Sequence, residues 1–253
     1  MSVCDIKVEL IKTSYINKPI GRVLIDELLT WVDSTSNSDE FISYILKKNS
    51  EEVIAMIRLS KNFKKAIIDY REDYLDDQGL IMDLLIEVLI RYSIIERNGF
   101  SMHAAAINHN DKGILFTAPS GIGKSTQAKL WQRYKQVEVL NDDRPIIRRS
   151  DGKWHVYGTP WSGSDLQILN KRVPLSAIIA IRQSTENSIR RLNSKEALAY
   201  VMPRCFLPYF NQQLMDTAIK HIGSVIKNTP IYLLSCKPDE EAVELVSKCL
   251  ELS

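Results

Sequence analysis

The segment at residues 113–126, Gly-Ile-Leu-Phe-Thr-Ala-Pro-Ser-Gly-Ile-Gly-Lys-Ser-Thr, constrains the fold more than any other part of this chain. Its first residues are typical of a buried strand, its middle is a loop that contains glycine, and a helix is expected over residues 127–134. This order is the layout of a phosphate-binding loop, in which backbone N–H groups, a helix N-terminus and a lysine converge on an anion. The sequence therefore predicts an α/β fold with such a loop at the end of one strand.

Individual residues of this segment have expected roles. Gly121 and Gly123 would form the turn, Lys124 would reach the terminal phosphates, and Ser125 would face a magnesium ion. Ala118 occupies the position where the full pattern has glycine, and an alanine with positive φ would be strained there. The alternative is an ordinary strand, turn and helix with a surface lysine. The residues expected to bind the triphosphate are Ser120, Gly121, Ile122, Gly123, Lys124, Ser125 and Thr126.

Bulk composition excludes several classes of protein. The chain has 253 residues, of which 45% are hydrophobic and 25% charged, so it can form one large domain or two small ones. A net charge of +2 gives no general attraction to nucleic acid or to a membrane. The most apolar segment, residues 80–95, is too short and too charged to span a bilayer. The charged N-terminus is not a signal peptide, and the scattered cysteines predict reduced thiols in a cytoplasmic protein.

The first 75 residues are expected to form a small β-rich part, followed by an α/β core over residues 76–253. The alternative is one continuous domain. Alternating side chains predict strands at 3–11, 52–59 and 66–70. Residues 20–31 fit a short helix or a strand, and residues 34–39 are a polar loop. A helix of about twenty residues is expected to begin at 76–78 and to end at Asn98 and Gly99.

Strands and helices then alternate, which favours a layered α/β architecture. Strands are expected at 100–107, 114–117, 137–140, 175–181 and 231–235, and a hairpin at 146–149 and 154–157. Helices are expected at 194–200, 211–227 and 239–250, the first of them capped by Ser194.

Two adjacent acids, Asp142 and Asp143, follow the strand at 137–140. Phosphoryl transfer needs an acid that holds magnesium and a group that orients or deprotonates the attacking hydroxyl, and this pair can divide those tasks. The alternative is a turn with two solvated acids. His103 lies on the strand before the loop's own strand, where it can donate to a phosphate, although a lone histidine on an apolar strand is more often structural.

Three further residues are candidates for substrate contact. Thr159 and Trp161 lie in a loop of residues 158–163 that is rich in glycine and proline, although a rigid turn is an equal alternative. Arg204 lies between two prolines and can clamp phosphate charge, although a plain surface arginine is the more common outcome.

Taken together, Ser-Met-His-Ala at 101–104, the loop at 118–125 and Asn-Asp-Asp-Arg at 141–144 resemble the HPr kinase/phosphorylase family. That family shares its core with ATP-dependent phosphoenolpyruvate carboxykinase. Gly-Thr-Pro-Trp at 158–161 and the segment at 173–182 look like a smaller HPr-kinase-like subfamily found beside peptide-modification gene clusters. The resemblance covers roughly residues 99–200, and it implies a mixed sheet with the phosphate-binding loop at its centre.

The resemblance also implies roles for single residues. Lys124 would bind the β- and γ-phosphates of ATP, Ser125 would bind Mg²⁺, and His103 would lie near the γ-phosphate. Asp142 would be the base on the acceptor hydroxyl and Asp143 the metal partner, with the order of these two roles left open. Members of the family often form oligomers, so a homo-oligomer is a further expectation.

The expected activity is therefore that of an ATP-dependent phosphotransferase with an alcohol group as acceptor. The preferred acceptor is a serine of a peptide or small protein. One alternative is a kinase for free serine or a sugar. Another is a nucleotide-binding regulator or scaffold with little transfer activity.

Overall fold

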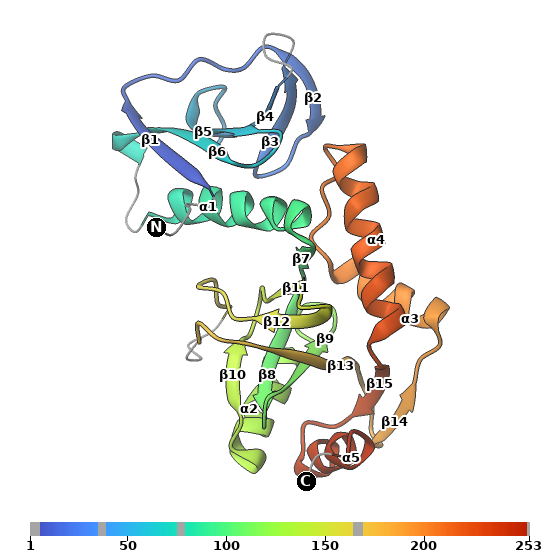
Figure 1. Cartoon of the computed structure of the whole chain (residues 1–253). Helices are drawn as coiled ribbons and strands as arrows, with labels where there is room; N and C mark the ends of the chain where they lie inside the picture. The colour runs from blue at the N-terminus through green and yellow to red at the C-terminus, as the bar shows by residue number, and fades with distance from the viewer. Residues whose placement is uncertain (1–5, 35–38, 75–78, 164–168, 252–253) are drawn as a thin grey trace. The chain divides into compact units, whose positions relative to one another are not determined.

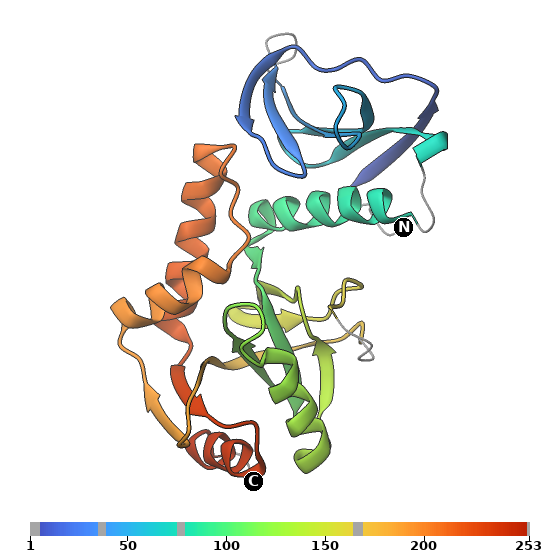
Figure 2. The same ribbon diagram turned by 180° about the vertical axis from the view of Figure 1, so that it is seen from behind.

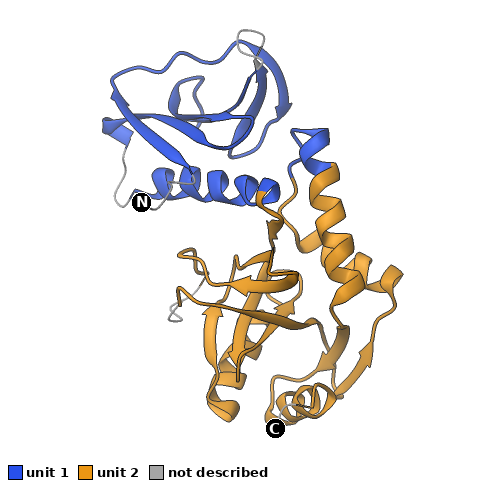
Figure 3. Cartoon of the chain, viewed as in Figure 1, with its two compact units in different colours: residues 1–96, 208–215 blue, residues 97–207, 216–253 orange. Residues whose placement is uncertain are grey.

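The computed structural model describes residues 6–34, 39–74, 79–163 and 169–251. It contains helices and two mixed sheets, which confirms the mixed α/β class (Figure 1). The chain divides into two compact units, one formed by residues 1–96 and 208–215 and the other by residues 97–207 and 216–253 (Figure 3). Each unit is described by itself below.

The first unit is built on a six-stranded sheet in the order β1-β6-β5-β4-β3-β2. β1 pairs with β6 in parallel and the remaining neighbours are antiparallel. Alternation places Ile57, Leu59 and Ile68 in its core, where each is fully buried. The strands are β1 Lys7–Thr13, β2 Gly21–Ile25, β3 Thr30–Ser34, β4 Glu40–Leu46, β5 Val53–Ser60 and β6 Lys65–Arg71, and the short helix η1 Glu72–Tyr74 follows them.

The strand predicted at 3–11 corresponds to β1, but residues 1–5 lie outside the described residues, as do residues 35–38 of the polar loop. Residues 20–31 contain β2 and the start of β3 rather than a helix. β4 was not expected from the sequence.

Helix α1 Leu80–Ser93 lies with the first unit, whereas the expected boundary at residue 75 places it in the core. Its buried side chains Leu85, Val88 and Leu89 form an apolar face, and the helix contacts β5. An apolar helix face must be covered by another element, and in this unit the sheet covers it. Residues 76–78, where the sequence predicts the helix to begin, lie outside the described residues.

A later part of the chain completes the core of the first unit. The ring of Phe210 stacks on Trp31 with ring centroids 3.8 Å apart and an interplanar angle of 2°. Tyr92 of α1 meets both rings edge-on, at 4.9 Å from Phe210 and 5.5 Å from Trp31. Residues 208–215 therefore belong to this unit through packing, although they are distant from it in sequence.

The second unit is built on a nine-stranded sheet with the main order β10-β8-β9-β13-β12-β11-β7, and β15 pairs with β13 and β14. The strands are β7 Gly99–Ser101, β8 Ala104–His109, β9 Lys112–Thr117, β10 Glu138–Asn141, β11 Ile146–Ser150, β12 Lys153–Tyr157, β13 Arg172–Gln183, β14 Ser188–Arg191 and β15 Ile231–Cys236. The helices that begin at or after residue 95 are η2 Ile95–Arg97, α2 Lys124–Lys135, α3 Ser194–Val201, η3 Met202–Arg204, α4 Gln212–Asn228 and α5 Glu240–Cys249.

Strands β9, β13 and β15 are parallel neighbours, so their carboxyl ends lie at one edge of the sheet. Helix α2 contacts β8, β9, β10 and α5, and Figure 2 shows it in front of these strands. The core that α2 and α5 form with the sheet includes Phe116, Trp131, Ile179 and Val243, all fully buried. This packing fixes the start of α2 at the end of β9.

The segment at 100–107, predicted as one strand, forms parts of two strands, β7 and β8. β7 pairs with β11, whereas β8 pairs with β9 and β10. Regular strand pairing is interrupted between them at Met102 and His103, and Met102 forms an isolated β-bridge to Cys205. His103 therefore lies at a junction and not inside a regular strand.

Two smaller differences concern the ends of elements. Helix α3 is capped by Asn193 and not by Ser194. The Asn193 side chain accepts from the Glu196 N–H at 3.0 Å, and the Glu196 carboxylate accepts from the Asn193 N–H at 3.0 Å. Strand β14 was not expected.

The predicted hairpin is present as β11 and β12, with Asp151 and Gly152 at positive φ in its turn. Within the described ranges, no helix combines the length and the apolar character needed to cross a bilayer.

Candidate active site

The loop at residues 118–123 connects β9 to α2 as expected. Gly121 and Gly123 have φ values of 78° and 119°, which favour glycine. A Cβ on Gly121 would meet no atom within 4 Å, so the loop is open at this position. Ala118 is not among the described residues with positive φ, so an alanine there is unstrained. The loop thus makes its turns at its two glycines and tolerates the departure from the full pattern.

Lys124 is the first residue of α2, and its side chain is buried, with the residue 7% exposed. Its Nζ donates to the Ala118 carbonyl at 3.4 Å, and it forms no ion pair with the residues that the structure describes. Burial lowers the pKa of Lys124, while the Asp143 charge raises it and the Arg204 charge lowers it. A buried ammonium at a helix N-terminus with one long hydrogen bond favours the binding of an anion.

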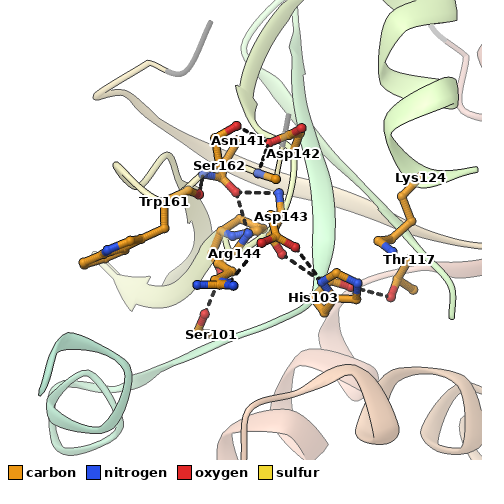
Figure 4. A network of polar contacts seen from close by, with 12 residues as sticks. Ser101, His103, Thr117, Lys124, Asn141, Asp142, Asp143, Arg144, Trp161 and Ser162 are labelled. Atoms are coloured by element: carbon orange, nitrogen blue, oxygen red, sulfur yellow. Dashed lines mark hydrogen bonds and ion pairs between the residues drawn. The ribbon is translucent and has the colours of Figure 1, made fainter. Parts of the chain in front are cut away.

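His103 and Asp143 form a pair near this lysine (Figure 4). His103 Nδ1 lies 2.8 Å from Asp143 Oδ1, and Arg144 Nε lies 3.0 Å from Asp143 Oδ2. The hydrogen bond from His103 lowers the pKa of Asp143, burial opposes this, and the charges of Arg144 and Lys124 lower it further. Asp143 is therefore an ionised carboxylate at neutral pH.

Backbone hydrogen bonds hold His103 in place at the break between β7 and β8. The His103 N–H donates to the Arg204 carbonyl at 2.6 Å, and the Ala104 N–H donates to the Asp143 carbonyl at 3.2 Å. Thr117 Oγ1, at the end of β9, donates to the His103 carbonyl at 3.2 Å. The junction thereby brings together three segments that are far apart in sequence.

Asp142 has different surroundings from Asp143. It is 2% exposed, and its Oδ1 accepts from Ser162 Oγ at 2.6 Å and from the Gly163 N–H at 3.0 Å. Gly163 also packs closely on Asp143, because a Cβ at this glycine would lie 3.2 Å from Asp143 Cβ. One acid therefore binds the loop at 158–163 while its neighbour faces His103.

Asn141 organises the turn that carries both acids. It is fully buried, and its Oδ1 accepts from the N–H groups of Asp143 at 2.9 Å and Arg144 at 2.7 Å. Its Nδ2 donates to the Trp161 carbonyl at 2.8 Å and to Thr159 Oγ1 at 3.0 Å. Asn141 is thus the residue that orients the two acids, and an asparagine at the end of a strand is a known signal for a side chain that bonds the following turn.

The three residues predicted to contact substrate have surroundings that differ from one another. Arg204 is close enough to influence the pKa of Lys124, and its backbone holds His103. Thr159 is buried, and its hydroxyl donates to the Arg144 carbonyl at 3.0 Å. In Figure 4 the indole ring of Trp161 points away from the other labelled side chains. Lys124, His103 and Asp143 thus lie together, Arg204 holds His103 through its backbone carbonyl, and Thr159 supports the turn beside them.

The chain belongs to the family described as SynChlorMet cassette protein ScmC, whose model matches residues 71–250. That description gives no activity. Among solved structures, the HPr(Ser) kinase/phosphatase from Coxiella burnetii is similar to this chain with 12% identity and a TM-score of 0.36, over 60% of this chain and 88% of that one. No curated protein matches the sequence. The resemblance to the HPr kinase/phosphorylase family stays a prediction.

Proposed function

We propose that this protein is an ATP- and Mg²⁺-dependent phosphotransferase whose acceptor is the alcohol group of a serine in a peptide or small protein. The observation that carries the proposal is the buried ammonium of Lys124 beside a loop with two glycines, electrostatically coupled to the Asp143 carboxylate. Lys124 follows β9 and Asp143 follows β10, and the carboxyl ends of these two strands lie at the same edge of the sheet. Phosphoryl transfer uses such a cation for phosphate together with an ionised acid.

The triphosphate would bind at residues 120–126. Backbone N–H groups of the loop, the positive end of α2 and Lys124 supply attraction for phosphate oxygens. Lys124 would exchange its 3.4 Å bond to the Ala118 carbonyl for stronger charge-assisted bonds to phosphate. Arg204 adds a second positive charge near Lys124.

The side chains present fit a magnesium ion that arrives with the nucleotide. Ser125 offers a hydroxyl at the first turn of α2 and Asp143 offers an ionised carboxylate, both of which are oxygen donors. Within the described residues, no group of three or more His, Cys, Asp or Glu side chains could hold a metal alone. Mg²⁺ is commonly bound by one or two protein oxygens together with substrate phosphates, and it would offset charge on the phosphate oxygens.

In the transfer step, the acceptor oxygen forms a bond to the γ-phosphorus while the bond from phosphorus to the bridging oxygen of ADP breaks. The acceptor proton passes to the pair of His103 and Asp143. The low pKa of Asp143 makes it a weak base, which is compatible with a loose transition state in which the proton leaves late. We therefore assign the proton-accepting role to the pair of His103 and Asp143, in addition to the metal-facing oxygen of Asp143, and a positioning role to Asp142. This assignment differs from the preferred order, in which Asp142 is the base and Asp143 only the metal partner.

The peptide acceptor rests on the resemblance of residues 158–161 and 173–182 to the peptide-modifying subfamily. A cytoplasmic location is part of this proposal, because ATP is plentiful there and Cys205, Cys236 and Cys249 are free thiols. A homo-oligomer remains a prediction.

The test compares Asp143→Asn with Asp142→Asn in transfer of labelled phosphate from ATP, with mass spectrometry of serine peptides, free serine and sugars as acceptors. Asp143→Asn is expected to lower transfer about a hundredfold or more while nucleotide binding persists. Asp142→Asn is expected to lower transfer less, because Asp142 bonds the loop at 158–163 and does not take the proton in this assignment.

Near-normal transfer in Asp143→Asn would show the role assignment to be wrong, and product on a free metabolite alone would reject the peptide acceptor. Binding of ATP without any product would instead favour a regulator.

A further inference from the structure

A cavity of about 360 Å³ lies directly beside the loop at 118–123. Its wall includes the loop residues Gly121, Ile122 and Gly123, together with Thr126 and Gln127 from the first turns of α2. The rest of the wall comes from the ends of β13 and β15 and the residues that follow them. The cavity and the proposed phosphate site therefore share one loop.

The topology of the sheet explains why a cavity forms at this place. β9, β13 and β15 run parallel, and the chain turns away from the sheet at the carboxyl end of each one. In open α/β sheets, ligands bind in the crevice outside the carboxyl ends of parallel strands. The wall residues Gln183, Ser184 and Pro238 lie at or just beyond two of these ends.

The cavity and the cluster of Lys124, His103 and Asp143 lie toward different neighbours of β9. His103 precedes β8, which pairs with β9 on one side, whereas the cavity is bounded by β13 and β15 on the other. A molecule that places its terminal phosphate toward His103 therefore has its opposite end directed toward the cavity.

The wall has the chemistry of a site for a flat, partly polar group. Ile122, Ile181 and Pro238 supply apolar surface, and Gln183, Ser184 and Lys237 supply polar groups. Gln127 is 2% exposed, and its Oε1 has no hydrogen-bond partner within the described part of the chain. Pockets for small ligands commonly have volumes of about 300–1,000 Å³, so the volume suits a nucleobase with its ribose.

We propose that this cavity binds the nucleobase and ribose of the nucleoside triphosphate whose phosphates occupy the loop. This assignment rests on the proposed function. The loop would bind the phosphates of the ligand, and the cavity would bind its nucleoside. It also assigns binding roles to Gln183, Ser184 and Pro238, which the sequence analysis did not single out.

The experiment uses the full chain and two ligands with Mg²⁺, ATP and inorganic tripolyphosphate, with both affinities measured by calorimetry. Gln183→Trp places a large side chain in the cavity wall. Thr185→Trp is the matched control, because Thr185 is an exposed residue just past the same strand and is not part of the wall. We expect the wild type and the control to bind ATP about tenfold more tightly than tripolyphosphate. In Gln183→Trp that ratio should fall to about one, with tripolyphosphate affinity kept within about twofold.

Retained tripolyphosphate binding also demonstrates that Gln183→Trp is folded. An unchanged ratio in Gln183→Trp, or equal affinity of the wild type for both ligands, would overturn the nucleoside assignment and leave the phosphate site standing. Failure of the wild type to bind either ligand would overturn the proposed function, and the nucleoside assignment with it.

Discussion

Lys124 holds its charge in surroundings that disfavour it. Burial removes water from the ammonium and lowers its pKa below the ordinary 10.5, while the Asp143 charge raises this pKa and the Arg204 charge lowers it. Such a group gains more from a bound anion than a solvated lysine would, because the anion replaces the missing solvent. A bound phosphate would thus offset the desolvation free energy of the buried Lys124 ammonium.

This predicts a pH dependence of nucleotide affinity. Because the pKa of Lys124 is lowered in the free protein, the lysine loses its proton below pH 10.5, and affinity should fall as pH rises through that pKa. Phosphate favours the charged form, so binding should be accompanied by proton uptake in the same pH range. Calorimetry in buffers of different ionisation enthalpy measures both effects.

Lys124→Met is the control for this titration, since it removes the ionising group while keeping an unbranched side chain. Its weaker affinity should lack the alkaline decrease. A wild-type affinity that stays constant up to pH 10.5 would contradict the prediction.

The residues of the site were partly predictable from sequence. Lys124, His103 and Asp143 carry chemistry in themselves, so their types and order indicate a phosphate site. The different surroundings of Asp142 and Asp143 could not be predicted, because they depend on Ser162 and Gly163 folding back onto one acid. Both acids lie in the turn after β10 that Asn141 organises, and the sequence does not say which of the two faces the ligand.

Helix α3 shows how a local motif decides an element boundary. Asn193 and Ser194 are both good N-cap residues, but only Asn193 is followed at the correct spacing by Glu196, with which it forms a capping box. The signal was therefore present in the sequence.

The cap makes a prediction for stability. Asn193→Ala should lower the free energy of unfolding by about 1 kcal/mol, because the Glu196 N–H loses its acceptor. Ser194→Ala, at the next and also exposed position, should change it by only a few tenths of a kcal/mol. Urea denaturation of both variants measures the difference, and a larger loss in Ser194→Ala would show that the serine is the cap.

Strand β4, strand β14 and the interruption between β7 and β8 were not predicted, and the reasons differ. β4 is rich in aromatic and β-branched residues, so its sequence carried a strand signal. β14 has only Ile189 as an apolar residue, and its pairing with β15 determines its conformation. The break between β7 and β8 follows from pairing with different partners, which no local pattern reports.

The division of the chain into two units depends on contacts between distant segments. Residues 208–215 return to the first unit, where Phe210 stacks on Trp31 and meets Tyr92 edge-on. Sequence periodicity identifies each of these residues as apolar, but it gives no information about which distant residue will pack against which. An N-terminal part that ends near residue 75 or 96 therefore lacks one aromatic ring of its own core.

This predicts that Phe210→Ala destabilises the first unit selectively. Phe210 is 7% exposed, and removal of a buried phenylalanine ring typically costs about 3–5 kcal/mol. Hydrogen exchange measured by mass spectrometry should show faster exchange in β3, β4 and β5, while β8 and β9 of the second unit retain their protection.

Tyr209→Ala is the matched control, because Tyr209 precedes Phe210 but is 72% exposed and should leave both units unchanged. The comparison separates packing from any effect of the local backbone, since both variants change an aromatic residue in the same short segment. Equal acceleration in both units of Phe210→Ala would mean that they unfold as one cooperative body. Unchanged exchange in β3 to β5 would mean that the ring stack contributes little to the core. Selective acceleration would instead establish that the first unit draws a necessary part of its core from residues that follow most of the proposed active site in sequence.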